Sequence, residues 1–170
     1  MTETWQNPEI QLVNLPAVED GNFQHHPVEY RKYRNFKATL LWSFPVLAYC
    51  IMVIVQFGIW AYFVGIALAV LMVLSYFGIN IGYRKRSYAM RDKDLTYKKG
   101  WLFYSTTTVP FNRIQHTEAS QGPLERRFDL STLNIYTAGG STSDLSIPGL
   151  KEEEAQQLRD FISKKVALYA

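Results

Sequence analysis

Several residues of this chain are of types that could do chemistry. His116, Asp129 and Ser131 could serve as base, orienting acid and nucleophile, and Glu118 with Glu125 could form a pair of catalytic carboxylates. No nucleophile elbow or other motif that would hold such groups in hydrogen-bond reach accompanies them. Trios and pairs of this kind occur by chance in any domain of this size. We therefore expect a protein that is not an enzyme.

Signals for a cofactor or a metal are equally weak. Gly139-Gly140-Ser141 lacks the lysine and the spacing of a phosphate-binding loop and is interpreted as a turn. Cys50 is the only cysteine, so neither a disulfide nor a cysteine-based metal site can form within one chain. The adjacent His25 and His26 are interpreted as solvated side chains. We expect no cofactor and no metal.

A long uncharged run dominates the elements that must position any functional residue. From Ala38 to Tyr83 the chain has no Asp, Glu, Lys or Arg. One bilayer-spanning helix needs about 20 apolar residues, so the run is long enough for two. Gln56-Phe57-Gly58 brings a polar residue and a helix breaker together near the middle. We predict a membrane helical hairpin with spans at 38–57 and 59–82. A hairpin buried in a soluble protein is disfavoured, because these helices lack a polar face.

Basic residues flank the outer ends of the predicted hairpin, and the connecting turn carries no charge. Cationic segments next to membrane spans stay on the cytoplasmic side, so both termini are expected in the cytoplasm. The clusters are Arg31, Lys32, Arg34 and Lys37 before the first span, and Arg84, Lys85 and Arg86 after the second.

Small residues within the second span recur at a spacing of four. Such stripes let helix backbones approach closely in lipid. We expect them to pack the two helices of the hairpin together, with a second protein as the alternative. No Asp, Glu, Lys, Arg or His lies in the spans, which disfavours a channel or a transporter. The residues are Ala61, Gly65, Ala69, Gly78 and Gly82.

The chain thus divides into an N-terminal segment (1–37), the hairpin (38–83) and a C-terminal domain (84–170). Alternating and β-prone residues predict strands at 95–97, 101–109, 114–120, 132–137 and 144–147, with Lys98-Lys99-Gly100 as the first hairpin turn and a helical turn at Gly122-Pro123-Leu124. The C-terminal domain has fourteen basic and ten acidic residues, a net charge of about +4, and lacks the dense basic patch that nucleic-acid binding would need.

The end of the chain has the pattern of an amphipathic helix. Acidic residues at 152–154 come first, and Lys164 and Lys165 lie near the other end, as the helix dipole favours. One apolar face is expected to close the sheet, with the Phe161 ring packed against it. Its members are Ala155, Leu158, Phe161, Ile162 and Val166.

Four stretches of the domain carry a resemblance to a known family: 109–116, 122–128, 133–140 and 147–150. They resemble the bacterial pleckstrin-homology-like membrane proteins of the YdbS-like type. The resemblance implies a bent antiparallel sheet of about seven strands whose open end a C-terminal helix closes. It also implies a multi-pass protein of the bacterial inner membrane. It implies no established activity, but it makes a longer membrane protein with repeated domains of this kind a candidate partner.

These observations lead us to expect a membrane-anchored scaffold that faces the cytoplasm and assembles with another membrane protein or a second copy of itself. The alternative is a sensor of anionic lipid at the bilayer surface. The loop Arg91-Asp92-Lys93-Asp94 corresponds to the phosphoinositide loop of eukaryotic domains of this shape, but its two acids offset its two bases. The residues expected to contact a partner or lipid are Arg84, Lys85, Arg86, Arg113, His116, Arg126 and Arg127.

Overall fold

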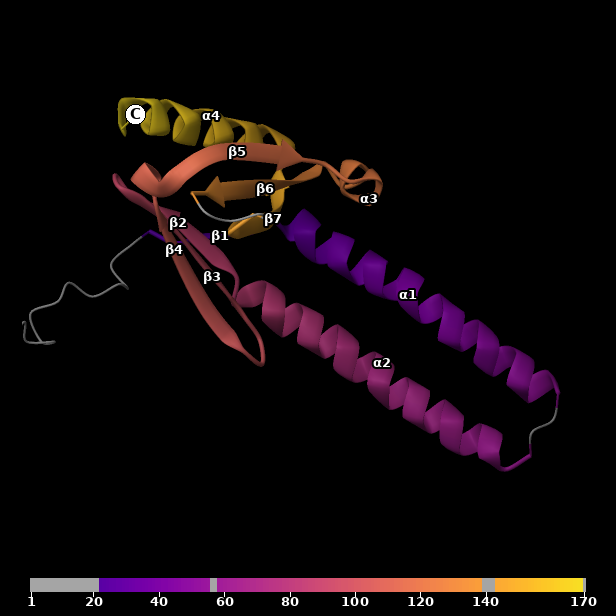
Figure 1. Ribbon diagram of the computed structural model, residues 1–170. Coiled ribbons are helices and arrows are strands. Elements are labelled where there is room, and N and C mark those ends of the chain that lie inside the picture. Colours follow the sequence, from indigo (N-terminus) through magenta and orange to yellow (C-terminus); the bar gives the residue numbers. More distant parts are fainter. Residues whose placement is uncertain (1–21, 56–57, 139–142, 170) are drawn as a thin grey trace, which may run out of the picture.

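Two long helices project side by side from a small β domain (Figure 1). This computed structural model describes residues 22–55, 58–138 and 143–169. The helices are α1 (Val28–Ile54) and α2 (Trp60–Arg84). A hydrogen bond of 2.7 Å between the hydroxyls of Thr39 and Tyr76 links them. The predicted helical hairpin is therefore confirmed.

Both helices are long and apolar enough to cross a membrane. None of the most apolar stretch of α1, and only 6% of that of α2, is buried within the protein. The core helix of a soluble protein would be buried, so these surfaces are suited to lipid. Helix α1 begins at Val28, ten residues before the predicted span, because its first turns pack on the domain. The predicted turn falls partly on residues 56–57, which lie outside the described residues.

The domain consists of two antiparallel sheets and a C-terminal helix. The first sheet has the order β1-β2-β3-β4, and the second has the order β5-β6-β7. The strands are β1 (Gln24–His25), β2 (Ser87–Met90), β3 (Asp94–Gly100), β4 (Tyr104–Pro110), β5 (Ile114–Ser120), β6 (Leu130–Thr137) and β7 (Leu145–Lys151). The expected fold of about seven bent antiparallel strands is confirmed. One strand, β1, comes from the N-terminal segment, which sequence reasoning left outside the sheet.

Apolar side chains from both sheets meet in one core. The strand residues of this core alternate along β3 and β6 and at Leu145 and Ile147 of β7, as the two-residue period of a half-buried strand requires. A short 3-10 turn (Phe111–Arg113) joins the sheets and places the Phe111 ring at the centre of the core. The fully buried side chains include Leu95, Tyr97, Phe111, Leu133, Ile135, Ile147, Leu150 and Ile162.

The C-terminal helix α4 (Glu152–Tyr169) packs on β5 and β6 and contributes to this core. Ala155 and Ile162 are fully buried, and Leu158 and Val166 pack beside them. The expectation for Phe161 was wrong, because 41% of this residue is exposed. Phe161 is rotated about 100° around the helix from Ile162, which places its ring at the edge of the apolar face.

The β3–β4 hairpin is longer than predicted. Lys98 pairs with Thr106 and Lys99 pairs with Ser105, so both lysines lie within β3. The predicted turn at Lys98–Gly100 was therefore wrong, and the chain turns at Trp101–Phe103 instead. A Cβ on Gly100 would lie 2.5 Å from the Phe103 carbonyl oxygen, so only glycine allows this close turn.

Candidate functional site

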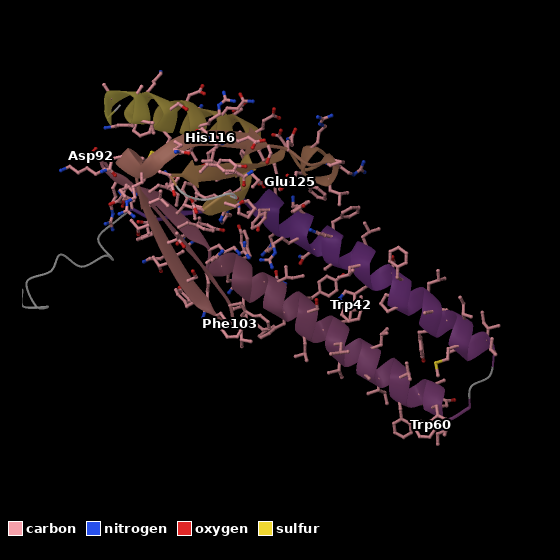
Figure 2. All side chains as sticks on the ribbon, viewed as in Figure 1. Trp42, Trp60, Asp92, Phe103, His116 and Glu125 are labelled. Carbon is pink, nitrogen blue, oxygen red and sulfur yellow. The ribbon has the colours of Figure 1, made fainter. Side chains whose placement is uncertain are left out.

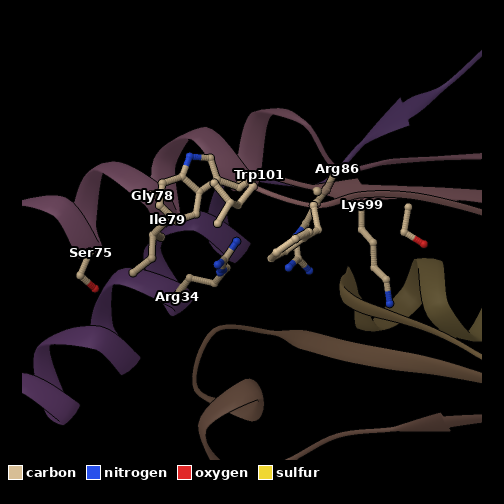
Figure 3. Close-up of a pocket in the computed structure, with 12 residues that line it drawn as sticks. Arg34, Ser75, Gly78, Ile79, Arg86, Lys99 and Trp101 are labelled. Carbon is tan, nitrogen blue, oxygen red and sulfur yellow. The ribbon is translucent and has the colours of Figure 1, made fainter.

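A cavity of about 520 Å³ lies where the helical hairpin meets the domain. Helix α1, helix α2 and the β3–β4 hairpin form its walls. Figure 3 shows it running from Ser75 and Ile79 on α2, past Arg34 and Trp101, toward Arg86 and Lys99. These residues come from segments far apart in the sequence, and the folded junction alone brings them together.

Three cationic side chains line one part of this cavity: Arg34 from α1, Arg86 from the link between α2 and β2, and Lys99 from β3. The Nη1 atom of Arg34 and the Nε atom of Arg86 are buried without a hydrogen-bond partner. Both guanidinium groups lie 5.9 Å from the centre of the Tyr30 ring, and Nη1 of Arg86 donates a hydrogen bond of 3.0 Å to the Tyr30 hydroxyl.

No carboxylate neutralises these two guanidinium groups within the part of the chain that the structure describes. The ion pair between Arg159 and Asp160 lies on α4 and involves neither of them. Partly buried charges without partners are costly, because the protein replaces the water that would solvate them. The cavity is therefore suited to bind an anion between the two arginines.

The other part of the cavity is apolar and runs along α2. The Trp101 ring lies against Gly78, where a Cβ would come within 3.0 Å of the indole. Ile79, Leu102 and Phe103 continue this wall. A cavity with a cationic end and an apolar wall fits an anionic amphiphile better than a small hydrophilic ion.

An aromatic cluster fixes the arginine-bearing wall to the domain. The His26 ring is buried, with its centre 5.0 Å from that of Tyr30, 5.9 Å from Tyr97 and 6.0 Å from Tyr88. The Tyr83 hydroxyl donates a hydrogen bond of 2.9 Å to the His26 carbonyl oxygen. Burial, with smaller contributions from Arg86 and other nearby cations, lowers the pKa of His26 to about 4. The interpretation of His26 as solvated was therefore wrong.

The candidate catalytic groups are held apart. His116 pairs with Tyr136 across the β5–β6 ladder, five residues along β6 from Ser131, which corresponds to about 16 Å. The Glu125 carboxylate instead caps helix α3 (Pro123–Arg126), since it accepts hydrogen bonds of 2.9 Å from the Gly122 backbone N–H and the Thr132 hydroxyl. Among the described residues, no group of three His, Cys, Asp or Glu side chains could hold a metal ion.

The sequence matches the family model described as "Bacterial PH domain" over residues 36–166. The chain belongs to the bacterial PH domain family. It is 38% identical over 77 residues to the UPF0699 transmembrane protein YdbS of Bacillus subtilis (strain 168), an alignment that covers 45% of this chain and 46% of YdbS. This similarity confirms the YdbS-like resemblance and the prediction that the chain is a membrane protein.

Two further comparisons are more distant. The UPF0699 transmembrane protein YdbT of the same organism is 28% identical over 103 residues, covering 60% of this chain and 21% of YdbT. A crystal structure of a DUF1696 family protein with a pleckstrin-homology domain from Shewanella loihica PV-4 aligns with a TM-score of 0.37 and 16% identity, over 48% of this chain and 72% of that one. The chain thus spans less than half of the length of each curated relative that it matches.

The predicted contact residues fall in separate parts of the PH domain. Arg86 lines the cavity, and the Lys85 ammonium lies 5.8 Å from the centre of the Tyr104 ring nearby. Arg84 is exposed at the end of α2, and Arg126 and Arg127 are exposed on and just after α3. Arg113 and His116 are exposed at the second sheet, where the His116 ring stacks on Tyr136.

The loop Arg91–Asp94, which the resemblance singled out as a possible phosphoinositide loop, lies at the opposite end of the first sheet from the cavity. Figure 2 shows Asp92 far from the helical hairpin, whereas Phe103 lies beside α2. Sequence reasoning missed Arg34, Lys99 and Trp101 as residues of the PH domain's cavity. A cationic residue just before a span and a tryptophan just after a predicted turn were the available signals.

The small residues of α2 have different neighbours. A Cβ on Gly65 would lie 2.5 Å from the Tyr49 hydroxyl, so this position faces α1. Gly78 contacts Trp101 of the PH domain, and a Cβ on Gly82 would lie 3.5 Å from Arg34 Nη1. Ala61 is partly buried and Ala69 is exposed. The glycines near the domain therefore make room for the cavity wall as well as for helix packing.

Proposed function

We propose that this chain is a non-catalytic membrane module whose PH domain holds the anionic headgroup of a lipid against its own helical hairpin. One observation carries the proposal: Arg34 and Arg86 line the junction cavity with buried nitrogen atoms and have no counter-ion among the described residues. This favours the lipid sensor over the scaffold that sequence reasoning ranked first.

The chemistry of the cavity suits a phosphate group. A planar guanidinium binds phosphate oxygens through two parallel hydrogen bonds, and such charge-assisted bonds are short and strong. Lys99 supplies a third positive charge on the other wall. The apolar wall along α2 continues from the cationic end, as an acyl chain of the same lipid would require. Anionic phospholipid is therefore the ligand class that matches both the cationic part and the apolar wall of the cavity.

The proposal includes a location in the cell. We place both termini in the cytoplasm of a bacterium and the helices in its inner membrane, and the basic clusters at the outer ends of the helical hairpin support this placement. The cavity would then open toward the cytoplasmic leaflet, whose surface is anionic. A scaffold role stays a prediction, since no observation in the described residues selects a protein partner.

The test uses the full chain in nanodiscs of phosphatidylcholine that contain a minority of phosphatidylglycerol. Lipid retained after transfer to neutral detergent is counted by native mass spectrometry. The test variant combines Arg34→Gln with Arg86→Gln. The control variant combines Arg126→Gln with Arg127→Gln, which removes the same charge from an exposed surface outside the cavity.

A direct hydrogen bond to a charged group contributes about 1.5 kcal/mol or more, so the test variant, which loses both guanidinium groups, should bind phosphatidylglycerol at least about 100-fold more weakly. The control variant should lose much less, and both variants should keep the thermal unfolding profile of the parent. An equal loss in the two variants would show diffuse electrostatic attraction in place of a site. A parent protein without preference for phosphatidylglycerol would refute the proposal.

A further inference from the structure

The tip of the β3–β4 hairpin exposes four consecutive large apolar or aromatic residues. The exposed fractions are 48% for Trp101, 75% for Leu102, 84% for Phe103 and 64% for Tyr104. A cluster of this kind on a water-soluble surface would favour aggregation. The position of this tip therefore decides which surroundings can cover it.

The hairpin extends beyond the rest of its sheet, on the side from which α1 and α2 project (Figure 1). Its tip lies beside α2, as the label of Phe103 shows in Figure 2. The close contact between the Trp101 ring and Gly78 fixes this placement. The tip and the bilayer-facing surface of α2 are thus continuous.

The contact at Gly78 also gives the depth of the tip. Gly78 precedes Arg84, the first charged residue after the apolar run, by six residues, which corresponds to about 9 Å along the helix. Tyr104 lies closer to the charged level, because the Lys85 ammonium is 5.8 Å from its ring centre. Lysine therefore lies on the water side and the two aromatic rings lie further in, at the level where tyrosine and tryptophan are enriched in membrane proteins.

We propose that Trp101, Leu102 and Phe103 insert into the boundary between headgroups and acyl chains of the leaflet that holds the cationic ends of α1 and α2. The inserted tip is a third attachment of the protein to the bilayer, and it fixes the orientation of the PH domain relative to the membrane. Insertion depends on apolar contact, so it takes place in uncharged lipid and holds whether or not the cavity binds an anionic headgroup.

Site-specific fluorescence in the full chain tests this proposal. In a Cys50→Ala background, Phe103→Cys is labelled with a polarity-sensitive dye and reconstituted into phosphatidylcholine vesicles. Leu168→Cys is the matched control, because Leu168 is 80% exposed but lies near the end of α4, away from the hairpin. Phosphatidylcholine with a nitroxide high on its acyl chain serves as the membrane quencher, and iodide serves as the aqueous quencher.

The dye at Phe103→Cys should emit at a shorter wavelength and be quenched several-fold more by the nitroxide lipid than the dye at Leu168→Cys. Iodide should give the reverse order. Equal nitroxide quenching at the two positions would overturn the proposal. Protection of the Phe103→Cys dye from both quenchers would also overturn it, because a protein surface would then cover the tip. Because Phe103 is exposed, the substitution should leave the fold intact, which thermal unfolding of the labelled protein verifies.

Discussion

Acidification should loosen the junction between the helical hairpin and the PH domain through His26. The ring is buried among Tyr30, Tyr88 and Tyr97, and Arg86, His25 and Arg34 act on it electrostatically. A protonated imidazole would add a charge to a site that already holds two guanidinium groups. The folded state therefore favours the neutral ring, which is why the pKa of His26 falls to about 4.

The size of the effect follows from proton linkage. An unfolded histidine has a pKa near 6.5, and the folded pKa is lower, so the unfolded state binds protons first as the pH falls. The stabilisation is fully present above pH 6.5 and is lost progressively between pH 6.5 and about 4. Between pH 7.5 and pH 5 the linkage equation gives a loss of about 2 kcal/mol in the free energy of unfolding.

Urea unfolding of the full chain in neutral detergent micelles, followed by near-UV circular dichroism of the tyrosines, measures this loss. The variant His26→Phe keeps an aromatic ring but cannot take up a proton, so its stability should change much less between the two pH values. The control His25→Gln alters the neighbouring exposed histidine and should keep the dependence of the parent. A parent protein that loses no more stability than His26→Phe would refute this reasoning.

Three further predictions concern packing and topology. Gly149→Ala should cost more than the 1–2 kcal/mol expected for a left-handed residue alone, because φ at Gly149 is 78° and a Cβ there would overlap the Tyr30 ring; urea unfolding measures it. Ile162→Ala should destabilise the domain by about 2–5 kcal/mol, and Phe161→Ala should destabilise it far less. Thermal unfolding measures both variants, and a larger loss for Phe161→Ala would show that α4 packs on the sheets through a different face. Reporter enzymes fused to the two termini should both report cytoplasm, while a reporter at Gly58 reports the opposite side.

The hairpin could be predicted from the sequence because its signal is local and strong. A charge-free run of sufficient length has few structural solutions, and the flanking cations mark its ends. The strands were found where the residues of two strand faces alternate, as Leu133 and Ile135 do with Thr132 and Asn134 in β6. The short strand β2 was missed because Ser87–Met90 follows a basic cluster and offers only four residues of pattern.

The cavity could not be predicted, because it depends on contacts between distant segments. In the sequence, Arg34 is only one of the basic residues that predict the membrane topology. It becomes a cavity residue because the β3–β4 hairpin packs Trp101 against Gly78 and forms the opposite wall of the cavity. The turn was predicted at Gly100 because glycine is common in turns. In the structure the β3–β4 ladder continues through Lys98 and Lys99, and the turn is formed by the bulky residues 101–103. His26 has no local pattern that reveals its burial between α1 and the first sheet.

The distance between a lipid phosphorus and the arginine side chains tests the central claim most directly. Solid-state NMR of the full chain in phosphatidylglycerol vesicles, with ¹⁵N-labelled arginine, measures it through the ³¹P–¹⁵N dipolar coupling. We predict guanidinium signals within about 5 Å of phosphorus, the separation that direct hydrogen bonds impose, and their loss in the variant with Arg34→Gln and Arg86→Gln. Unchanged couplings in that variant, or couplings lost only with Arg126→Gln and Arg127→Gln, would contradict the proposed lipid site.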